Sequence, residues 1–200
     1  MMDLRTLVRR GMRSALPNMP IRGRYYMADR VGRWASPVPP TEVVDVNGLR
    51  VAIDHRHLSC RNMYYRVYEA DFVRFLERTL RPGDTFMDLG ANIGYIAGVA
   101  YGLVGASGKV LAYEPSRTCF DELRRNNPAW PAGMTLTNAA ITDRVGTMPF
   151  MDTERVVSSG FSVLLHDRRP GPNDRVYDVD VTTIDHELEK HGVARVACIK

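Results

Sequence analysis

The chain has 200 residues, of which 44% are hydrophobic and 25% are charged. These proportions are ordinary for a soluble globular protein, and they exclude a disordered, collagen-like or fibrous chain. One domain of ordinary size fits this length and can bury roughly 70% of its unfolded surface without disulfide or metal staples. No apolar stretch reaches the ~20 residues of a membrane-spanning helix, and no signal peptide is predicted.

Three cysteines, Cys60, Cys119 and Cys198, lie at irregular spacing without a CxxC pair. An odd number at such spacing predicts reduced, packed thiols rather than a disulfide framework or a zinc site. We therefore expect a cytoplasmic protein without a bound metal.

The net charge of +4 is unevenly distributed. Residues 1–35 carry a net charge of +6, and the rest of the chain carries −2. We interpret residues 1–41 as a basic arm or linker, with a short amphipathic helix over 3–12 that Gly11 and Pro17 limit. Such an arm is either simply solvated or makes weak contact with an anionic membrane surface.

Residues 42–57 alternate apolar and polar positions around Asn47-Gly48. This pair tolerates the positive φ angles of a type I′ turn, so a β-hairpin is predicted. On its second strand His55 and His57 would share one face, as a metal site requires. The alternative is a polar strand face, which we favour because no third ligand has suitable spacing.

The central part of the chain alternates helical and strand patterns. A helix is predicted over 69–80, where apolar residues recur at helical spacing, and Pro82-Gly83 ends it. Strands are then predicted over 85–90, 109–115 and 134–141, and helices over 93–104 and 116–126. This order predicts an α/β fold, in which a mostly parallel sheet has helices on both faces.

The remaining segments complete one domain over residues 42–200, whose cofactor-binding core is 69–144. Short strand-like runs separated by polar residues predict an insertion or antiparallel flap over 145–181. Thr182 and Asp185 fit a capping box for a helix that ends at Gly192. A fourth buried strand is predicted over 195–200.

The sequence DLGANIG at 88–94 is typical of a nucleotide-cofactor loop after a first strand. Gly90 and Gly94 allow a tight turn and close approach to a ligand. Asp88 precedes the loop at a position where a buried carboxylate needs a cation or amide donors. Glu114 ends the next strand, where an acid accepts hydrogen bonds from ribose hydroxyls.

The loop also bears on which adenosine cofactor binds. In the dinucleotide fingerprint the second glycine makes room for the pyrophosphate, and Asn92 stands there in this chain. We therefore expect S-adenosylmethionine, whose ammonium end Asp88 would face. An NAD-binding oxidoreductase is the alternative.

The sequence resembles the FkbM-type class I methyltransferases. The resemblance covers about residues 64–200. It is carried by YEADF at 68–72, PGDTFMDLGANIGYIAG at 82–98, VLAYEPS at 110–116, TNAAITDRVG at 137–146, SSGFSVLL at 158–165, VTTID at 181–185 and ACIK at 197–200. It implies a Rossmann-like three-layer sandwich, S-adenosylmethionine as methyl donor, and O-methylation of a hydroxyl on a sugar, glycolipid or polyketide-like small molecule.

The resemblance also implies roles for individual residues. The methionine and ribose would contact Asp88, Gly90, Ala91, Asn92, Gly94 and Tyr95. Glu114 would hold the ribose hydroxyls, and the adenine would contact Pro115, Ser116, Asn138, Ala139 and Ala140. For Asn138 a strand-end turn is an equal alternative, and for Glu69 a solvated helix face is preferred to a cofactor contact.

The family pattern continues beyond Ile199-Lys200 with an acidic motif and further strands. We therefore expect a fragment of a longer chain, with a short variant completed by another chain as the alternative. No general base is assigned. His166 in the flap is a candidate, although a surface turn is the preferred interpretation.

The expected partner is a small-molecule or glycan acceptor beneath the 145–181 flap. No nucleic acid is expected, because outside the arm no basic stripe is interleaved with aromatics. The alternatives are a nucleic-acid methyltransferase anchored by the arm and a non-catalytic cofactor-binding module.

Overall fold

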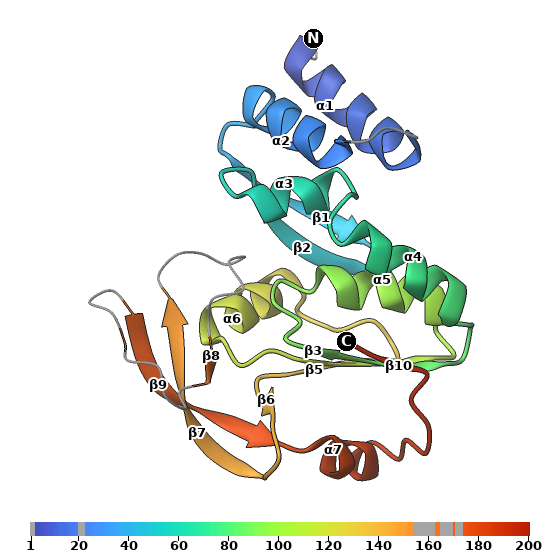
Figure 1. Cartoon of the computed structure of the whole chain (residues 1–200), viewed down its shortest axis with the longest axis vertical. Coiled ribbons are helices and arrows are strands. Elements are labelled where there is room, and N and C mark those ends of the chain that lie inside the picture. Colours follow the sequence, from blue (N-terminus) through green and yellow to red (C-terminus); the bar gives the residue numbers. More distant parts are fainter. Residues whose placement is uncertain (1–2, 20–22, 154–162, 165–169, 171–173) are drawn as a thin grey trace.

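A four-stranded parallel sheet lies at the centre of the molecule, in strand order β10-β3-β4-β5 (Figure 1). The structure is a computed structural model that describes residues 3–19, 23–153, 163–164, 170 and 174–200. The four strands are β3 (Thr85–Leu89), β4 (Lys109–Tyr113), β5 (Met134–Thr137) and β10 (Cys198–Ile199). All three pairings are parallel, which confirms the predicted α/β class.

Helices cover both faces of this sheet because successive side chains of a strand point to opposite sides. Phe86 and Val110 pack into the main core with α5 (Tyr95–Val104), on the face that α6 (Arg117–Asn126) also covers (Figure 1). Met87 and Leu111 face the other way, toward α7 (Ile184–Lys190). The predicted three-layer arrangement is confirmed.

The predicted hairpin is present outside this sheet. Its strands β1 (Thr41–Val46) and β2 (Leu49–Asp54) pair antiparallel. Asn47 and Gly48 form the turn with φ angles of 53° and 92°. Neither His55 nor His57 lies on a strand: His55 is buried against Glu42, and His57 precedes the next helix. The HxH pair therefore does not form the shared strand face that the sequence predicted.

The segment interpreted as an arm contains two helices that join the fold. They are α1 (Leu4–Ala15), which runs through Gly11 into the short 3-10 helix η1 (Leu16–Asn18), and α2 (Arg24–Trp34). Leu16 and Ala28 are buried in the main core. The helices pack because these few apolar residues are supplemented by ion pairs, which hydrophobic periodicity does not reveal.

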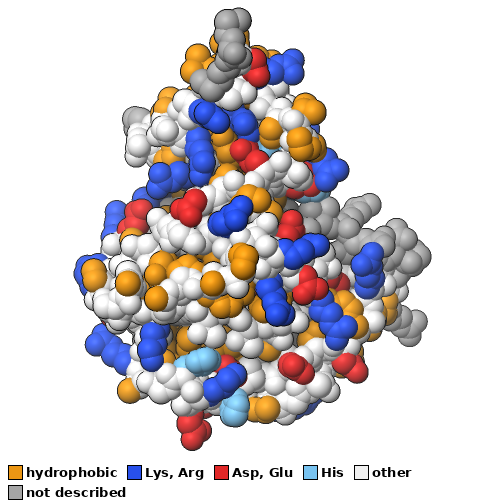
Figure 2. Space-filling model, turned by 180° about the vertical axis from the view of Figure 1, so that it is seen from behind, with side chains coloured by type: hydrophobic (Ala, Val, Ile, Leu, Met, Phe, Trp, Pro, Cys, Tyr) orange, Lys and Arg blue, Asp and Glu red, His pale blue; other side chains and the backbone are white. Residues whose placement is uncertain are grey.

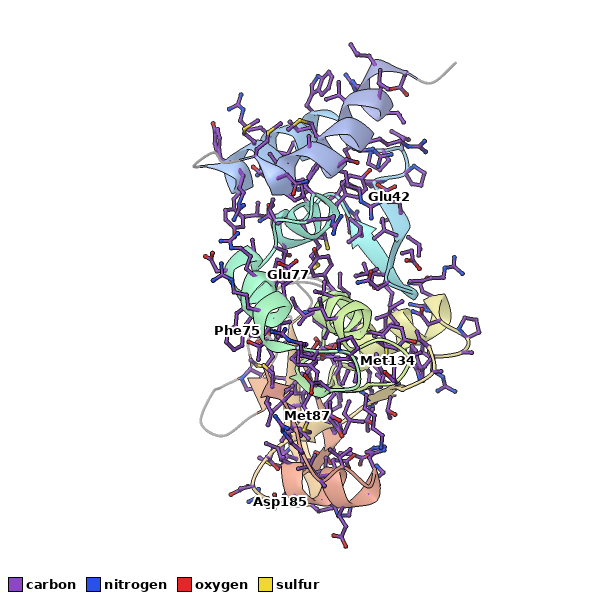
Figure 3. All side chains as sticks on the ribbon, turned by 90° about the vertical axis from the view of Figure 1, so that its right-hand side faces the viewer. Glu42, Phe75, Glu77, Met87, Met134 and Asp185 are labelled. Carbon is purple, nitrogen blue, oxygen red and sulfur yellow. The ribbon has the colours of Figure 1, made fainter. Side chains whose placement is uncertain are left out.

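Two further helices, α3 (Leu58–Tyr64) and α4 (Ala70–Thr79), connect the hairpin to the sheet. In the side view of Figure 3, the N-terminal helices lie at one end of the molecule, followed by the hairpin near Glu42 and α4 near Glu77. The sheet at Met87 comes next, and α7 at Asp185 lies at the other end. From behind, basic side chains lie over the N-terminal half with exposed apolar side chains between them (Figure 2). No helix in the described ranges is long and apolar enough to cross a lipid bilayer.

Three glycines of the loop and helix α5 form the seat on which the hairpin packs. A Cβ at Gly98 would lie 2.6 Å from the Val46 carbonyl oxygen, and one at Gly102 would lie 2.3 Å from the Asn47 amide nitrogen. Gly94 meets Leu49 of β2 in the same way, at 2.8 Å. These glycines are therefore required for packing of the hairpin on α5.

A second sheet of order β6-β9-β7-β8 lies beside the first. The strands are β6 (Ala140–Ile141), β7 (Gly146–Thr153), β8 (Val163–Leu164) and β9 (Asp174–Thr182), with β7 antiparallel to β9. The predicted strand 134–141 is thus divided: the Ala139 N–H donates to the Thr137 carbonyl in a tight turn, and Ala140 enters the second sheet. Much of the predicted flap, including His166 and Asp167, lies outside the described residues.

The cap of helix α7 lies one residue later than predicted. Thr182 ends β9, and its hydroxyl donates to Glu187 Oε1 at 3.1 Å. The Thr183 hydroxyl instead accepts from the His186 N–H at 3.1 Å. The capping-box prediction at Thr182 was therefore wrong in register, because the last strand residue is still held in the sheet.

Candidate functional site

The glycine loop turns back over the end of β4. Gly90, Asn92 and Gly94 have φ angles of 83°, 52° and 84°, a left-handed region that favours glycine and admits asparagine. The N–H groups of Gly90 and Ala91 both donate to the Tyr113 carbonyl, at 2.8 and 2.9 Å. The loop is therefore tied to the neighbouring strand.

The remaining N–H groups of the loop also have acceptors within the chain. Asn92 N–H donates to Glu114 Oε2 at 2.6 Å, Ile93 N–H to the Asn92 side-chain oxygen at 2.7 Å, and Gly94 N–H to the Ala91 carbonyl at 2.8 Å. A loop that binds a pyrophosphate needs free N–H donors. This loop offers none from residues 90–94, which is a physical argument against a dinucleotide.

Glu114 is buried at the carboxyl end of β4, with 7% of its surface exposed. Its Oε1 accepts from the Ser116 N–H at 2.8 Å, and its Oε2 accepts from Asn92. Burial, with a further contribution from the nearby charges of Asp152 and Asp88, raises the pKa of Glu114 to about 7, although the two backbone donors oppose the rise. Each carboxylate oxygen has a second lone pair, so Glu114 retains acceptor capacity toward hydroxyl groups.

Asp152 joins this site from the second sheet. Its Oδ2 accepts from the Ser116 hydroxyl at 2.8 Å and from the Tyr177 hydroxyl at 2.9 Å. Ser116 also caps α6, because its oxygen accepts from the Cys119 N–H at 3.3 Å. The end of β4 is thereby fastened to β7 and β9 by side-chain hydrogen bonds.

Asp88 is fully buried on the adjacent strand, and its Oδ1 lies 3.2 Å from the Lys200 ammonium. Burial raises the pKa of this carboxyl group, Glu69 adds to the rise, and Lys200 opposes it. Burial also raises the pKa of the Tyr68 hydroxyl, with Glu69 and Asp88 contributing. Asp88, Glu69 and Tyr68 therefore lie within electrostatic reach of one another, and the nearest cation comes from the chain itself.

The residues expected near the adenine lie at the ends of β4 and β5. The Asn138 amide donates to the carbonyls of Glu114 and Pro115, at 2.7 and 3.2 Å. Ala139 is buried beside it. Asn138 therefore stands at a strand-end turn and fixes the backbone next to Glu114, and its contact with an adenine stays a prediction.

Two of the expected loop residues face away from this edge. Gly94 contacts Leu49 and Leu123, as its packing beneath the hairpin requires. The Tyr95 ring packs edge-to-face on Tyr68 at 5.8 Å and borders a cleft on the N-terminal side of α5. Asp88, Asn92, Glu114, Ser116 and Asn138 are brought together, whereas the contacts of Gly94 and of the Tyr95 side chain lie elsewhere.

Sequence reasoning missed Asp152, Tyr68 and Lys200 as neighbours of the site. Asp152 lies 38 residues after Glu114 and arrives through a separate sheet, so no local spacing reveals it. An acid that follows the apolar run Met148–Met151 was the available signal. Lys200 belongs to a strand that the sequence predicted, but its partner could be identified only from the parallel pairing of β10 with β3.

These residues fit an uncharged nucleoside better than a pyrophosphate. Glu114 can accept from ribose hydroxyls, and a Cβ at Gly90 would meet no atom within 4 Å, so space is open beside the loop. No group of three or more potential metal ligands occurs among the residues that the structure describes.

Comparison with known families decides the classification. The family model described as the methyltransferase FkbM domain matches residues 88–200. The chain belongs to this family. The matched region begins at Asp88 and includes Glu114, Asn138 and Asp152, so the FkbM domain contains the three carboxylates at the end of the parallel sheet.

Other comparisons add little. No curated protein matches the chain. Among solved structures the chain is similar to the crystal structure of a SAM-dependent O-methyltransferase from Thermotoga maritima, with 15% identity and a TM-score of 0.31. The similarity covers 58% of this chain and 66% of that one, just under two thirds of its length.

Proposed function

We propose that the protein is an S-adenosylmethionine-dependent O-methyltransferase whose acceptor is a hydroxyl of a sugar, glycolipid or polyketide-like small molecule. The observation that supports it best is the pairing of Glu114 with a glycine loop whose five N–H groups all bond within the chain. Glu114 can accept hydrogen bonds from ribose hydroxyls, and residues 90–94 leave no free backbone N–H for a pyrophosphate. Membership of the FkbM methyltransferase family supports the same reaction class.

The chain's own residues would bind and orient the donor. S-Adenosylmethionine, when bound, supplies an electrophilic methyl group on a sulfonium. Glu114 would accept hydrogen bonds from the ribose, and Asn138 holds the backbone of Glu114 and Pro115 in place for this contact. Asp88, which pairs with Lys200, would supply negative charge for the ligand's ammonium group. Positioning of the reacting groups is the contribution expected of such a site.

Calorimetric titration with S-adenosylhomocysteine and with NAD tests the donor. We expect S-adenosylhomocysteine to bind. Glu114→Ala should lower its affinity by about 10- to 150-fold, which corresponds to the free energy of hydrogen bonds to a charged group. Glu189→Ala is the matched control, because Glu189 is exposed on α7, and it should bind normally. Tighter binding of NAD than of S-adenosylhomocysteine would exclude the proposal.

The pH dependence of binding sharpens this test. A carboxylate with a pKa of about 7 is mostly neutral at pH 6 and mostly charged at pH 8. Because ribose hydroxyls donate to the charged form, S-adenosylhomocysteine should bind about tenfold more weakly at pH 6 than at pH 8. Glu114→Gln should abolish this difference. A wild-type affinity independent of pH would contradict the assigned role of Glu114.

A further inference from the structure

A cleft lies between α5 and the N-terminal helices, away from Glu114. It consists of two adjoining cavities of about 380 and 460 Å³, which share Asn47, Arg66, Tyr95 and Val99 in their walls. The walls come from the N-terminal helices α1, η1 and α2, from β1 and the hairpin turn, and from α3, α4 and α5 with the connection between α3 and α4. The volumes fall in the range of small-molecule sites.

Positive charge predominates in this cleft. Arg13, Arg24, Arg66 and Arg74 line it, against the carboxylates of Asp45 and Glu77. Asp45 is engaged in the hairpin turn, where its Oδ1 accepts from the Gly48 N–H at 3.2 Å.

The four arginines differ in how far the protein already uses them. Arg74 pairs with Asp71, whereas Arg13 and Arg24 lie over the rings of Tyr64 and Tyr25. Arg66 has no ion pair or hydrogen bond from its guanidinium within the described part of the chain. Its charge is therefore available to a ligand.

The backbone holds Arg66 in a fixed, unusual conformation. Its φ angle is 59°, and it directly follows the end of α3. The Arg66 N–H donates to the Met63 carbonyl at 3.0 Å, and the Val67 N–H donates to the Asn62 carbonyl at 2.9 Å. A non-glycine residue kept in this region costs free energy, and such positions cluster at ligand sites.

Tyr95 supplies a hydroxyl donor at the junction of the two cavities. Burial raises the pKa of Tyr95 to about 12, and the positive charges of Arg66 and Arg13 oppose the rise. The three groups therefore lie within electrostatic reach of one another. A neutral hydroxyl beside two guanidinium groups is a suitable donor set for an oxyanion.

Part of the remaining wall is apolar, and Ser14, Asn18 and Asn47 add polar groups to it. Val44, Val46 and Met63 line one cavity, and Val73 and Leu103 line the other. A ligand that filled this space would bury hydrocarbon while its anionic group met the arginines.

We propose that this cleft binds an organic anion, in which a phosphate or carboxylate is attached to an apolar body, with Arg66 as its principal charged contact. The inference concerns binding alone and is measured without S-adenosylmethionine, so it stands or fails separately from the proposed methyl transfer.

The test is calorimetric titration of the full chain with n-octyl phosphate and with octanoate at low ionic strength. Inorganic phosphate and n-octyl glucoside, which lack the apolar body and the charge respectively, are the comparison ligands. Arg66→Gln should lower the affinity for n-octyl phosphate about tenfold or more, and Tyr95→Phe should lower it severalfold. Arg78→Gln makes the same charge change at an exposed position of α4 outside the cleft and should bind like wild type.

Each outcome decides the matter. Binding of the octyl anions that is weakened by Arg66→Gln but not by Arg78→Gln would support the site. If n-octyl glucoside bound as tightly as n-octyl phosphate, the site would not require an anion. If inorganic phosphate bound as tightly, the site would not require an apolar body. Either result, or loss of binding by Arg78→Gln as well, would overturn the proposal.

Discussion

Two regions of the molecule handle charge in opposite ways. At the edge of the parallel sheet, the carboxyl groups of Asp88 and Asp152 both raise the pKa of Glu114, and Lys200 pairs with Asp88. In the N-terminal layer, the buried arginines are matched by carboxylates: Arg9 pairs with Glu42, and Arg61 pairs with Asp29.

The difference distinguishes structural charge from charge available for binding. Matched buried pairs hold elements together, and breaking one leaves an uncompensated charge. Grouped carboxylates of one sign destabilise the folded state, and such groups cluster at functional sites. We therefore expect substitutions in the N-terminal layer to change stability, and substitutions at the sheet edge to change ligand binding and pH dependence.

The largest effect is expected at Arg61. Its Nε donates to Asp29 at 2.9 Å, its Nη1 donates to the His55 carbonyl at 2.5 Å, and its side chain packs where a Cβ at Gly32 would clash. Arg61→Ala should lower the free energy of unfolding by about 3–5 kcal/mol, the usual result of breaking a buried pair. Urea denaturation followed by circular dichroism measures it.

The control is Arg33→Ala, which removes the other partner of Asp29. Arg33 is largely exposed, and an exposed ion pair contributes about 0–1 kcal/mol. Equal losses for Arg61→Ala and Arg33→Ala would show that the N-terminal layer does not depend on its buried pair.

A second effect concerns pH and Glu114. Its pKa is about 7 in the folded chain against 4.5 ordinarily, so between these values the folded state holds a proton that the unfolded state releases. The free energy of unfolding should therefore fall as pH rises through this window. The expected loss is about 3 kcal/mol, since one pKa unit corresponds to about 1.4 kcal/mol.

Glu114→Gln cannot lose a proton and should lack this dependence. Stability curves of both proteins from pH 4.5 to pH 8 give the difference directly, because all other titrating groups are common to them. Parallel curves would mean that the sheet edge is not strained by its negative charge.

The smallest effect concerns the packing of the hairpin on α5, which lies between the two regions. Gly98→Ala would place a Cβ 2.6 Å from the Val46 carbonyl oxygen, and the overpacking should cost about 1–3 kcal/mol. Gly11→Ala meets nothing within 4 Å in the middle of α1 and should stabilise by about 0.5–1 kcal/mol through helix propensity. Thermal unfolding of both variants should therefore show opposite shifts, and a Gly98→Ala variant as stable as wild type would contradict the close packing of the hairpin on α5.

The sequence allowed prediction of features that depend on local pattern. Gly90 and Glu114 stand at the ends of strands whose apolar runs are evident, and their proximity follows from parallel pairing. Asn47-Gly48 predicted its turn because only a few residues accept two positive φ angles.

Features built from distant segments could not be predicted. Asp152 reaches Ser116 through a second sheet, and Arg61 finds Asp29 across 32 residues. Gly98 and Gly102 looked like ordinary small residues of an apolar helix until the hairpin was placed against them. The N-terminal helices were interpreted as an arm because their apolar contacts, such as those of Leu16 and Met27, and their ion pairs are both made with distant segments.

The bonds at the end of β4 have a mechanical consequence. Asn138 fastens the backbone of Glu114 at the point where the chain passes from one sheet to the other, and Ser116 and Arg117 fasten the same corner to Asp152 and to the Asp178 carbonyl. The two sheets therefore meet at a braced corner rather than at a hinge. A displacement of β7 or β9 would be transmitted through these hydrogen bonds to the backbone next to Glu114.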